Sequence, residues 1–465
     1  MSLSATDFNS ANKKSRKKVL VLGAGLAGLA AAWELQKSGN DVLVLEARQR
    51  PGGRVSTISK LFAPGLSIEE GAAAFSESYT YAMALIEEFG LERIPYSMPS
   101  APVTYMLQGK RFNVGAGESV TWPYELTREE QELGPFGIVQ KYLMDTLPPE
   151  IQDPDKWERR PLLGMDDTSL KEYLRSKGAS QGAVELVRNT MWFAAVPDRT
   201  SGLSMAVSDM GMFLSGRPFL LKDGNDSLPR AMAKKMEGSI RYGIHVTEVL
   251  DTGRAVKVSG RTGDTTVIHE ADEVIIAVPL KVLERLNFEP SLPDNKKSAV
   301  SNMPVLNLTR TVLQVKKPYW QEQGESGLAF TDLPIGQVNA YLNMTDPAVS
   351  PALLESYTAG PSAERFSGIP ELEILQKVGQ EMEEIHPGLM QNYQKGYLKE
   401  WGSDPYALGG PSWPAPGDVE KYLKTLQEPV GRLHFAGEYT SILRSTMEGA
   451  LRSGARAARE VCERS

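Results

Sequence analysis

The first strong hydrophobic pattern in the chain lies close to its N-terminus. Residues 18–22 (KVLVL) form a short run rich in Val and Leu, which is typical of a buried parallel strand. A helical segment runs from Leu26 to about Ser38 and ends at Gly39, a residue suited to a left-handed C-cap. Residues 41–45 again have the apolar pattern of a strand. The order strand, helix, strand predicts the start of an α/β fold.

Three glycines connect this first strand to its helix. Gly23, Gly25 and Gly28 fit G-x-G-x-x-G, in which the first glycine permits a tight turn, the second lets a pyrophosphate approach the backbone, and the third lets the helix approach the strand. The helix N-terminus offers unpaired N–H groups to phosphate. Glu46, 18 residues after Gly28, can accept hydrogen bonds from both ribose hydroxyls. The unit predicts an ADP-containing dinucleotide, for which FAD and NAD both qualify at this point.

A second glycine pair follows shortly afterwards. In "EARQRPGGRVST", Gly52 and Gly53 are followed at once by Arg54. Two glycines let the chain pass close to a phosphate, and an arginine fork can neutralise it. An ordinary turn with a surface arginine is the alternative interpretation.

The hydrophobic pattern near the C-terminus predicts one more strand and one more helix. Residues 433–436 read as a buried strand that ends at Gly437, and Glu438 is placed like a carboxylate that accepts from a flavin ribityl chain. From about Thr446 the chain reads as a helix with a stripe of small residues that allows very close packing, at Ala450, Gly454 and Ala458. The N-terminus of such a helix would stabilise the negative charge of a reduced flavin. Alternatively, the helix merely closes the core.

Composition narrows the class of protein. A chain of 465 residues suggests two domains. With 41% hydrophobic residues and no apolar run of eighteen, we expect a soluble, cytoplasmic protein without a membrane span. The net charge of −7 argues against nucleic acid as a partner and is compatible with a cationic substrate. Cys462 is the only cysteine, so no intramolecular disulfide is expected, and four scattered histidines predict no metal site.

Four motifs carry a resemblance to a known family. "RPGGRVST", "WGSDPYALGGPSWPAPG" from Trp401, "HFAGEYTS" and "MEGALRSGARAA" occur in this order. With them the chain resembles the flavin-containing amine oxidase superfamily, and it is most like the FAD-dependent L-amino-acid oxidases. The resemblance implies an α/β fold in which a discontinuous, Rossmann-like FAD-binding domain is joined to a mixed α+β substrate domain.

The domain boundaries follow from where strand and helix signals alternate. Residues 1–16 are polar and aperiodic and are expected to form a disordered arm. The FAD-binding domain is predicted to comprise residues 17–95, 225–287 and 429–465. The substrate domain is predicted to comprise residues 96–224 and 288–428, with a helical cap because strand signals are few between about Thr127 and Met236.

The resemblance also implies the residues that contact FAD. They lie in the two glycine loops, after the second strand, around residues 71–73, in the strand that contains Val246, and near the C-terminus: Gly23, Gly25, Leu26, Ala27, Gly28, Glu46, Ala47, Arg48, Gly53, Arg54, Gly71, Ala72, Ala73, Val246, Trp401, Gly437, Glu438, Thr446 and Met447. Val246 is expected to contact the adenine through its backbone. Because Cys462 lies at the end of the last helix, the flavin is predicted to be bound without a covalent link.

Arg310 is the first candidate catalytic residue. It lies in the alternating segment "LNLTRTVLQV", on one face with Leu308, Val312 and Gln314, and ten residues before Trp320. At this spacing many members of the superfamily have a lysine that holds a water near flavin N5. Arg310 could hold that water or bind a substrate carboxylate. Alternatively, it is a strand-edge arginine paired with an acid.

The residues expected around the substrate depart from the family pattern. L-amino-acid oxidases have an arginine that clamps the carboxylate where this chain has Ala74. Arg310 and Arg444 are the candidate replacements, although Arg444 also reads as a solvent-facing loop residue. Monoamine oxidases have two aromatic residues around the amine. Thr446 stands in place of one, and Trp413, the second catalytic candidate, either supplies one wall or serves only packing.

The resemblance implies oxidative deamination of an L-amino acid. Hydride would pass from the α-carbon to flavin N5, and the imine would hydrolyse to a 2-oxo acid and ammonia. Reoxidation by oxygen would give H2O2, unless another electron acceptor serves. A primary amine or polyamine is the alternative substrate. A different class, an FAD-bound scaffold or an enzyme acting on a non-amine such as a carotenoid, stays open, and a homodimer is allowed.

Overall fold

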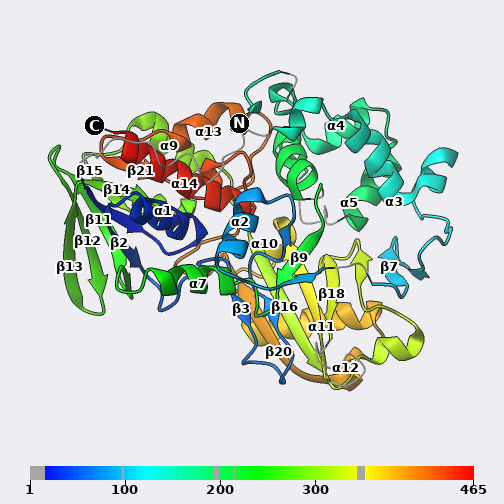
Figure 1. Cartoon of the computed structure of the whole chain (residues 1–465). Coiled ribbons are helices and arrows are strands. Elements are labelled where there is room, and N and C mark those ends of the chain that lie inside the picture. The colour runs from blue at the N-terminus through cyan, green and yellow to red at the C-terminus, as the bar shows by residue number, and fades with distance from the viewer. Residues whose placement is uncertain are drawn as a thin grey trace.

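The computed structural model shows an α/β protein with a parallel sheet, a mixed sheet and a group of helices that covers the mixed sheet (Figure 1). It describes residues 16–96, 99–153, 156–160, 162–191, 198–213, 215–342 and 351–464. The predicted arm comprises residues 1–16, and residues 1–15 of it lie outside the described residues.

The parallel sheet has five strands in the order β10-β2-β1-β14-β21. These strands are β10 (Ile240–Tyr242), β2 (Asp41–Glu46), β1 (Lys18–Leu22), β14 (Glu273–Ile276) and β21 (Leu433–Phe435), and each neighbouring pair is parallel. The sheet therefore combines three stretches of chain that are far apart in the sequence. This arrangement is the predicted discontinuous, Rossmann-like fold, which is confirmed.

Helices cover one face of the parallel sheet. α1 (Leu26–Lys37) and α14 (Met447–Glu463) lie side by side, and their buried side chains share a core with α2 (Thr80–Glu88) and α7 (Ser227–Lys235). The contact between α1 and α14 is very close, since a Cβ on Gly454 would lie 2.0 Å from the carbonyl oxygen of Ala27. The close packing expected from the stripe of small residues in the last helix is therefore present.

A second sheet and two helices cover the other face. The sheet has the order β13-β12-β11-β15, formed by β13 (Thr265–Ala271), β12 (Val256–Thr262), β11 (His245–Asp251) and β15 (Asn287–Glu289). Its buried side chains share one core with α9 (Asp294–Asn302) and α13 (Asp418–Gln427). Both helices fall within segment 288–428, which is predicted to belong to the substrate domain, and the domain boundaries themselves stay a prediction. An amphipathic pattern shows that a helix has a buried face but not which sheet it covers.

The mixed sheet has seven strands in the order β20-β16-β19-β18-β17-β7-β8. They are β20 (Tyr393–Glu400), β16 (Leu308–Val315), β19 (Ala352–Ala359), β18 (Gln337–Tyr341), β17 (Ala329–Thr331), β7 (Val103–Leu107) and β8 (Lys110–Val114). α11 (Glu371–Ile385) packs on this sheet through a shared apolar core. All eight residues of β16 are buried, and the strand pairs with neighbours on both sides.

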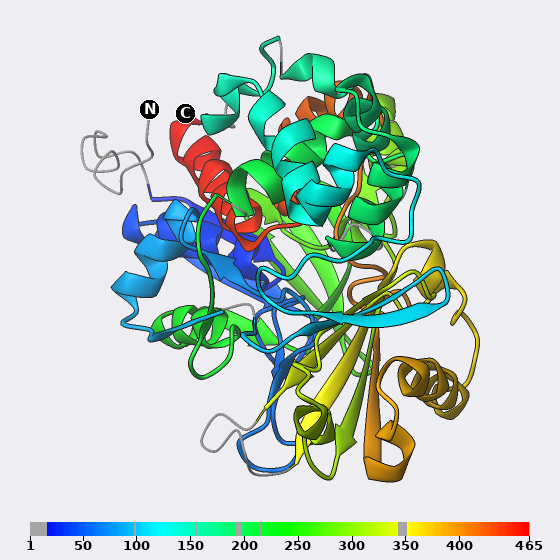
Figure 2. The ribbon, with the colours of Figure 1, turned by 90° about the vertical axis from the view of Figure 1, so that its right-hand side faces the viewer.

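The helical cap lies above the mixed sheet in Figure 2. It comprises α3 (Arg128–Tyr142), α4 (Leu170–Ser176), α5 (Gln181–Thr190) and α6 (Gly202–Met205), followed by a π-helical segment, η6 (Ala206–Phe213). Thr127 and Ser169 begin α3 and α4 with capping boxes. The cap leads into β9 (Pro218–Leu221), which pairs with β5 (Phe75–Ser76) and β6 (Arg93–Pro95).

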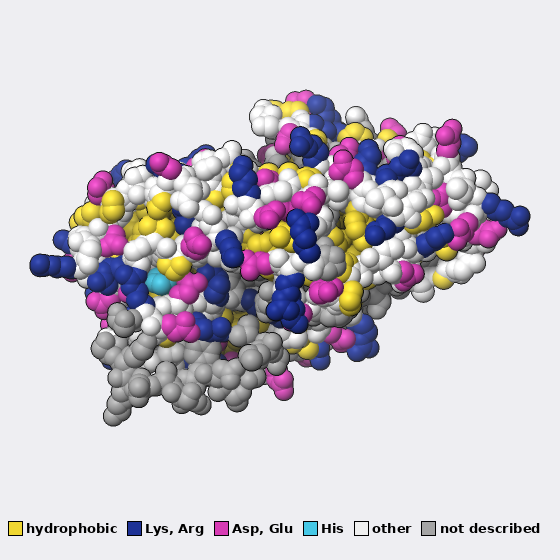
Figure 3. All heavy atoms as spheres, turned by 90° about the horizontal axis from the view of Figure 1, so that it is seen from above, with side chains coloured by type: hydrophobic (Ala, Val, Ile, Leu, Met, Phe, Trp, Pro, Cys, Tyr) yellow, Lys and Arg dark blue, Asp and Glu magenta, His cyan; other side chains and the backbone are white. Residues whose placement is uncertain are grey.

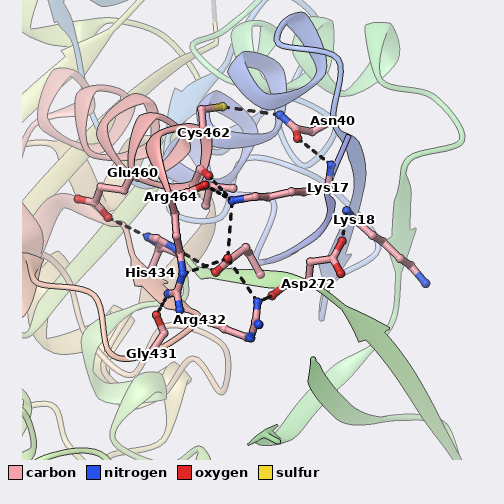
Figure 4. Close-up of polar contacts among 12 residues, drawn as sticks. Lys17, Lys18, Asn40, Asp272, Gly431, Arg432, His434, Glu460, Cys462 and Arg464 are labelled. Carbon is pink, nitrogen blue, oxygen red and sulfur yellow. Dashed lines mark hydrogen bonds and ion pairs between the residues drawn. The ribbon is translucent and has the colours of Figure 1, made fainter. Parts of the chain in front are cut away.

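An ionic cluster fixes the C-terminal end of α14 to the parallel sheet (Figure 4). The buried carboxylate of Glu273 lies 3.3 Å from Nε of Arg464, 3.8 Å from Nζ of Lys17 and 3.4 Å from Nε2 of His434. The other ring nitrogen of His434 lies 3.1 Å from Glu460 on α14. The C-terminal end of α14 is thus anchored to the parallel sheet.

The surface shows no single dominant charge on the face drawn in Figure 3. Lys and Arg side chains are interspersed with Asp and Glu over the described residues of this face. Such mixing differs from the basic stripe that binds nucleic acid. Among the described residues, no helix has the length and apolar character needed to cross a membrane.

Candidate active site

A cavity of about 1020 Å³ lies where the parallel sheet, the cap and the mixed sheet meet. Most residues predicted for the site line it: Gly23, Gly25, Leu26, Ala27, Glu46, Ala47, Arg48, Gly53, Arg54, Gly71, Ala72, Ala73, Ala74, Val246, Arg310, Trp401, Trp413, Gly437, Glu438, Thr446 and Met447. Gly28 and Arg444 are not among the lining residues. The volume is at the upper end of the range for small-molecule pockets, roughly 300–1,000 Å³.

The two glycine loops meet at one end of the cavity. The backbone N–H of Gly52 donates to the carbonyl of Ala24 at 2.8 Å, and Gly25 forms a β-bridge with Gly52. A Cβ on Gly25 would meet no atom within 4 Å, so the backbone here faces open space. Both loops predicted to approach a pyrophosphate therefore face the same volume.

Gly28 has a packing role instead. A Cβ at this position would lie 1.9 Å from the carbonyl oxygen of Gly23, so α1 could not approach β1 with any larger residue. This is the role of the third glycine in the motif. It explains why Gly28 does not reach the cavity.

Glu46 lies at the carboxyl end of β2, with its side chain at the cavity wall. Its carboxylate accepts hydrogen bonds from the backbone N–H groups of Ala24 at 2.7 Å and Arg48 at 2.8 Å. Burial raises the pKa of Glu46, although these two backbone hydrogen bonds oppose the shift. A carboxylate has about four acceptor sites, so Glu46 can still accept from a ribose.

Arg54 and Glu438 join segments that are far apart in the sequence. The Arg54 guanidinium contacts the carbonyl of Gly410 and lies 3.3 Å from the Glu438 carboxylate. Glu438 also accepts from the backbone N–H groups of Ser412 at 3.1 Å and Ser445 at 3.2 Å. The carboxylate expected beside the ribityl chain thus orders the loop that leads into α14.

The N-terminus of α14 opens onto the cavity. Thr446 is its N-cap, accepting from the N–H of Gly449 at 2.9 Å and donating to the carbonyl of Leu443 at 2.6 Å. Thr446 and Met447 both line the cavity, so the positive end of the helix dipole is directed into it. The glycine cradle, Glu46 and this helix terminus fit a flavin dinucleotide.

The substrate end of the cavity is built from one face of three neighbouring strands. In the strand register, Arg310 on β16 faces Tyr357 on β19, and Glu355 on β19 faces Asn339 on β18. Arg310 donates to the Glu355 carboxylate at 2.5 Å and to the carbonyl of Gly71 at 2.8 Å. Glu355 also accepts from the Tyr341 hydroxyl at 2.6 Å and from the Asn339 amide at 3.1 Å.

This network corrects one interpretation of Arg310. The residue lies on an interior strand of the sheet, not at an edge, and it is fully buried yet lines the cavity. Burial acts to lower the pKa of Arg310, but its contacts with the Glu355 carboxylate and with Tyr341 and Tyr357 together raise that pKa above its usual value. Pairing with an acid was one of the two interpretations of the sequence, and it is the arrangement observed.

Trp413 and Arg444 form one stacked unit behind the cavity wall. Trp413 lines the cavity, and its indole N–H donates to the hydroxyl of Thr200 at 2.5 Å. The Arg444 guanidinium lies 4.0 Å from the centre of the Trp413 ring and donates to Ser204. Arg444 is 3% exposed, so the interpretation as a solvent-facing residue is wrong. Arg444 is not among the lining residues, so it does not reach the cavity in which it would have to bind a substrate carboxylate.

Trp401 forms the wall beside the segment that contains Ala74. Its indole N–H donates to the carbonyl of Glu70 at 2.7 Å, and a Cβ on Gly71 would lie 3.2 Å from its ring. Lys399 lies 4.3 Å from the ring centre on β20, but does not line the cavity. The small side chain of Ala74 adds no charged group to this part of the wall.

Several cavity residues were missed from the sequence. Asn339, Tyr341 and Tyr357 line the substrate end, and Asn339 and Tyr341 lie two residues apart on β18. The alternation in "QVNAY" indicates that Asn339 and Tyr341 lie on one face of a strand. The sequence does not show which strands are its neighbours. Glu69 also lines the cavity, accepting from Thr57 and from the N–H of Asn225 at 2.9 Å each, and burial raises its pKa to about 7.

Cys462 lies away from this cavity. It is half-buried on α14, where its Sγ accepts from the amide of Asn40 at 3.6 Å (Figure 4). Within the described part of the chain, no group of three or more His, Cys, Asp or Glu side chains could hold a metal ion.

Comparison with known sequences places the chain in one family. A family model described as flavin-containing amine oxidoreductase matches residues 26–462. An L-amino-acid oxidase of Demansia vestigiata is 27% identical over 462 residues, which cover 96% of this chain and 86% of that protein. An L-amino-acid oxidase of Echis ocellatus is 28% identical, and the match covers 96% of this chain and 89% of that protein.

Comparison with solved structures supports the fold. Wild-type putrescine oxidase bound to putrescine has a TM-score of 0.78 at 22% identity, with 97% of this chain and 99% of that chain covered. Cyclohexylamine oxidase from Brevibacterium oxydans IH-35A has a TM-score of 0.77 at 22% identity, with 96% and 99% covered. Since the family match spans nearly the whole chain, this protein belongs to the flavin-containing amine oxidoreductases and is an FAD-dependent enzyme.

Proposed function

We propose that the protein oxidises a primary amine that carries no carboxylate. The main support for this proposal is that each arginine in the described cavity lining is paired with an acid. Arg48 pairs with Asp404, Arg54 with Glu438 and Arg310 with Glu355. A carboxylate brought from water into this cavity would need a positive partner, because burying a charge without such a partner costs several kcal/mol.

The residues around the substrate favour an amine in a second way. Glu69 is the carboxyl group of the chamber wall whose contacts are neutral donors, and burial raises its pKa to about 7. Near neutral pH it therefore carries part of a negative charge. The opposite charges of Arg310 and Glu355 cancel, so the cavity attracts an ammonium ion more than a carboxylate.

The chain orients the substrate and the cofactor supplies the chemistry. FAD held by the two glycine loops and Glu46 would supply the acceptor for a hydride from the carbon next to the amine nitrogen. Trp401 and Trp413 form walls of the chamber, and Tyr341 and Tyr357 project from the mixed sheet. Aromatic walls exclude water and limit the orientations of the bound amine, which brings its C–H bond close to the cofactor.

An L-amino acid is the second candidate substrate. The specific observation in its favour is the name of the relatives that match over 96% of the chain, which are L-amino-acid oxidases at 27% and 28% identity. With such a substrate, Arg310 would have to bind the carboxylate while still in contact with Glu355. The product would be a 2-oxo acid instead of an aldehyde.

The two candidates are separated by product analysis on matched substrates. Phenethylamine and L-phenylalanine, or putrescine and L-ornithine, differ only in the carboxylate. We expect aldehyde and H2O2 from the amines, with a kcat/KM at least about tenfold above that for the amino acids. Ala74→Arg, which adds an arginine to the cavity wall, should narrow this difference. A higher kcat/KM for the amino acids in the wild type would refute the proposal.

A further inference from the structure

The buried pair of Arg310 and Glu355 is fully enclosed at the substrate end of the cavity. The Arg310 side chain is 3% exposed and that of Glu355 is 0% exposed, with 2.5 Å between the guanidinium and the carboxylate. Replacing a buried ion pair with apolar residues is often neutral or stabilising, so stability is a weak reason for such a pair. Arg310 lines the cavity and Glu355 is its partner behind the lining, which suggests that the pair has a role in substrate choice.

Glu355 and Arg310 differ in how many of their hydrogen-bonding atoms have a partner. Both oxygens of Glu355 are occupied, by Arg310 on one side and by Tyr341 and Asn339 on the other. Arg310 keeps one donor without a partner, since its buried Nε has no hydrogen bond within the described structure. The arginine therefore retains hydrogen-bonding capacity, whereas its positive charge is compensated by Glu355.

We infer that Glu355 is a specificity-determining residue that masks Arg310 and thereby excludes carboxylate-bearing substrates. This inference rests on the proposed function. The cavity contains the residue type that binds carboxylates in a bidentate manner, but the neighbouring strand supplies the competing carboxylate. The charge balance of this pair, more than the shape of the chamber, then decides between an amine and the corresponding amino acid.

Two opposite substitutions test the inference. Glu355→Gln keeps acceptors and donors near Arg310 and Tyr341 but removes the negative charge, so Arg310 becomes free to bind a carboxylate. The ratio of kcat/KM for L-phenylalanine to that for phenethylamine should rise about tenfold or more. Arg310→Gln leaves Glu355 uncompensated, so the ratio for putrescine over n-butylamine should rise, because a second ammonium can bind there.

A binding measurement makes the test independent of turnover. Benzoate should bind the flavin-loaded Glu355→Gln variant about tenfold more tightly than it binds the wild type. Titration calorimetry measures both affinities. Adding Arg310→Met to Glu355→Gln should abolish that gain. Glu381→Gln is the matched control, because it removes the charge of a carboxylate that pairs with Arg365 away from the cavity lining, and it should leave benzoate affinity and the amino-acid ratio near the wild-type values.

The outcomes separate this inference from the proposed function. A wild type that prefers amines, together with a Glu355→Gln variant of unchanged selectivity and benzoate affinity, overturns the masking role alone. A wild type that prefers amino acids overturns the proposed function. If Glu355→Gln does not retain FAD, the Arg310→Gln variant decides, since an unchanged preference between putrescine and n-butylamine would refute a charge-based role for the pair.

Discussion

Glu69 is a buried carboxyl group of the cavity wall whose charge changes near neutral pH. Burial raises its pKa from 4.5 to about 7. Between these values the folded protein keeps a proton that the unfolded chain has lost, so the free energy of unfolding falls as the pH rises through this window. Glu69→Gln should remove a fall of roughly 3 kcal/mol between pH 4.5 and 7.

Urea unfolding of the wild type and of Glu69→Gln at several pH values measures this difference. The two stability curves should diverge as the pH rises from 4.5 to 7 and run parallel above that range. Glu237→Gln, at an exposed position, serves as the control. Parallel curves for wild type and Glu69→Gln over the whole range would mean that Glu69 titrates normally.

Glu46 is the residue that we expect to bind the ribose of the dinucleotide. Glu46→Ala removes an acceptor that already orders the backbone at Ala24 and Arg48. The loss of charge-assisted hydrogen bonds should weaken FAD binding by roughly 1.5–3 kcal/mol. Asp41→Asn, at the exposed opposite end of β2, is the control in a fluorescence titration of apoprotein with FAD. Equal FAD affinity in wild type and Glu46→Ala would place the ribose elsewhere.

The stripe of small residues in the last helix predicts close packing, and the structure shows that α1 is the helix packed against it. In Gly454→Ala the added methyl would lie 2.0 Å from the Ala27 carbonyl and 2.9 Å from the Ala31 nitrogen, both of which are backbone atoms. The two helices must separate, which should cost about 1–3 kcal/mol of stability. Because α14 begins at the cavity, FAD retention should fall as well.

Gly379→Ala in α11 is the matched control for this substitution. Its added methyl would meet only Met390 at 3.5 Å and Leu313 at 3.7 Å, which are ordinary contacts. Replacement of glycine within a helix should therefore stabilise by roughly 0.5–1 kcal/mol. Thermal unfolding of both variants makes the comparison, and a similar melting temperature for the two would contradict close packing of α1 on α14.

Local patterns predict single elements better than their neighbours in space. The alternation in residues 308–315 predicts the strand β16, yet nothing local shows that β19 supplies Glu355 beside Arg310. Glycine spacing predicts the cradle because each glycine has a local steric reason. By contrast, the loop position of Arg444 suggests exposure, whereas long-range packing against Trp413 buries it.

The whole molecule forms its active site where sheets from distant chain segments meet. The cofactor end could be predicted from the sequence, because one β-α-β unit contains most of its motif. The substrate end could not, since Asn339, Tyr341 and Glu355 come together only through the register of the mixed sheet. The core that α9 and α13 share with the parallel sheet could not be predicted for the same reason, because the apolar face of a helix does not show which sheet buries it.

The way FAD is attached is also a property of the whole molecule. Cys462, the one cysteine of the chain, lies on the part of α14 that contacts Asn40, away from the cavity. We therefore expect acid precipitation of the yellow protein to release all of the flavin as intact FAD into the supernatant. Flavin that stays with the precipitated protein would demonstrate a covalent link to another residue.

We propose that the cavity accepts an amine and rejects a carboxylate because each of its lining arginines is paired with an acid. The most direct measurement is anaerobic mixing of the purified flavoprotein with phenethylamine, L-phenylalanine, putrescine and L-ornithine in a stopped-flow spectrometer. Loss of the oxidised flavin absorbance reports the reductive step without any contribution from oxygen. We expect the amines to bleach the flavin faster than their matched amino acids at equal concentration. Faster bleaching by the amino acids, or none with any primary amine in a broader panel, would contradict the claim.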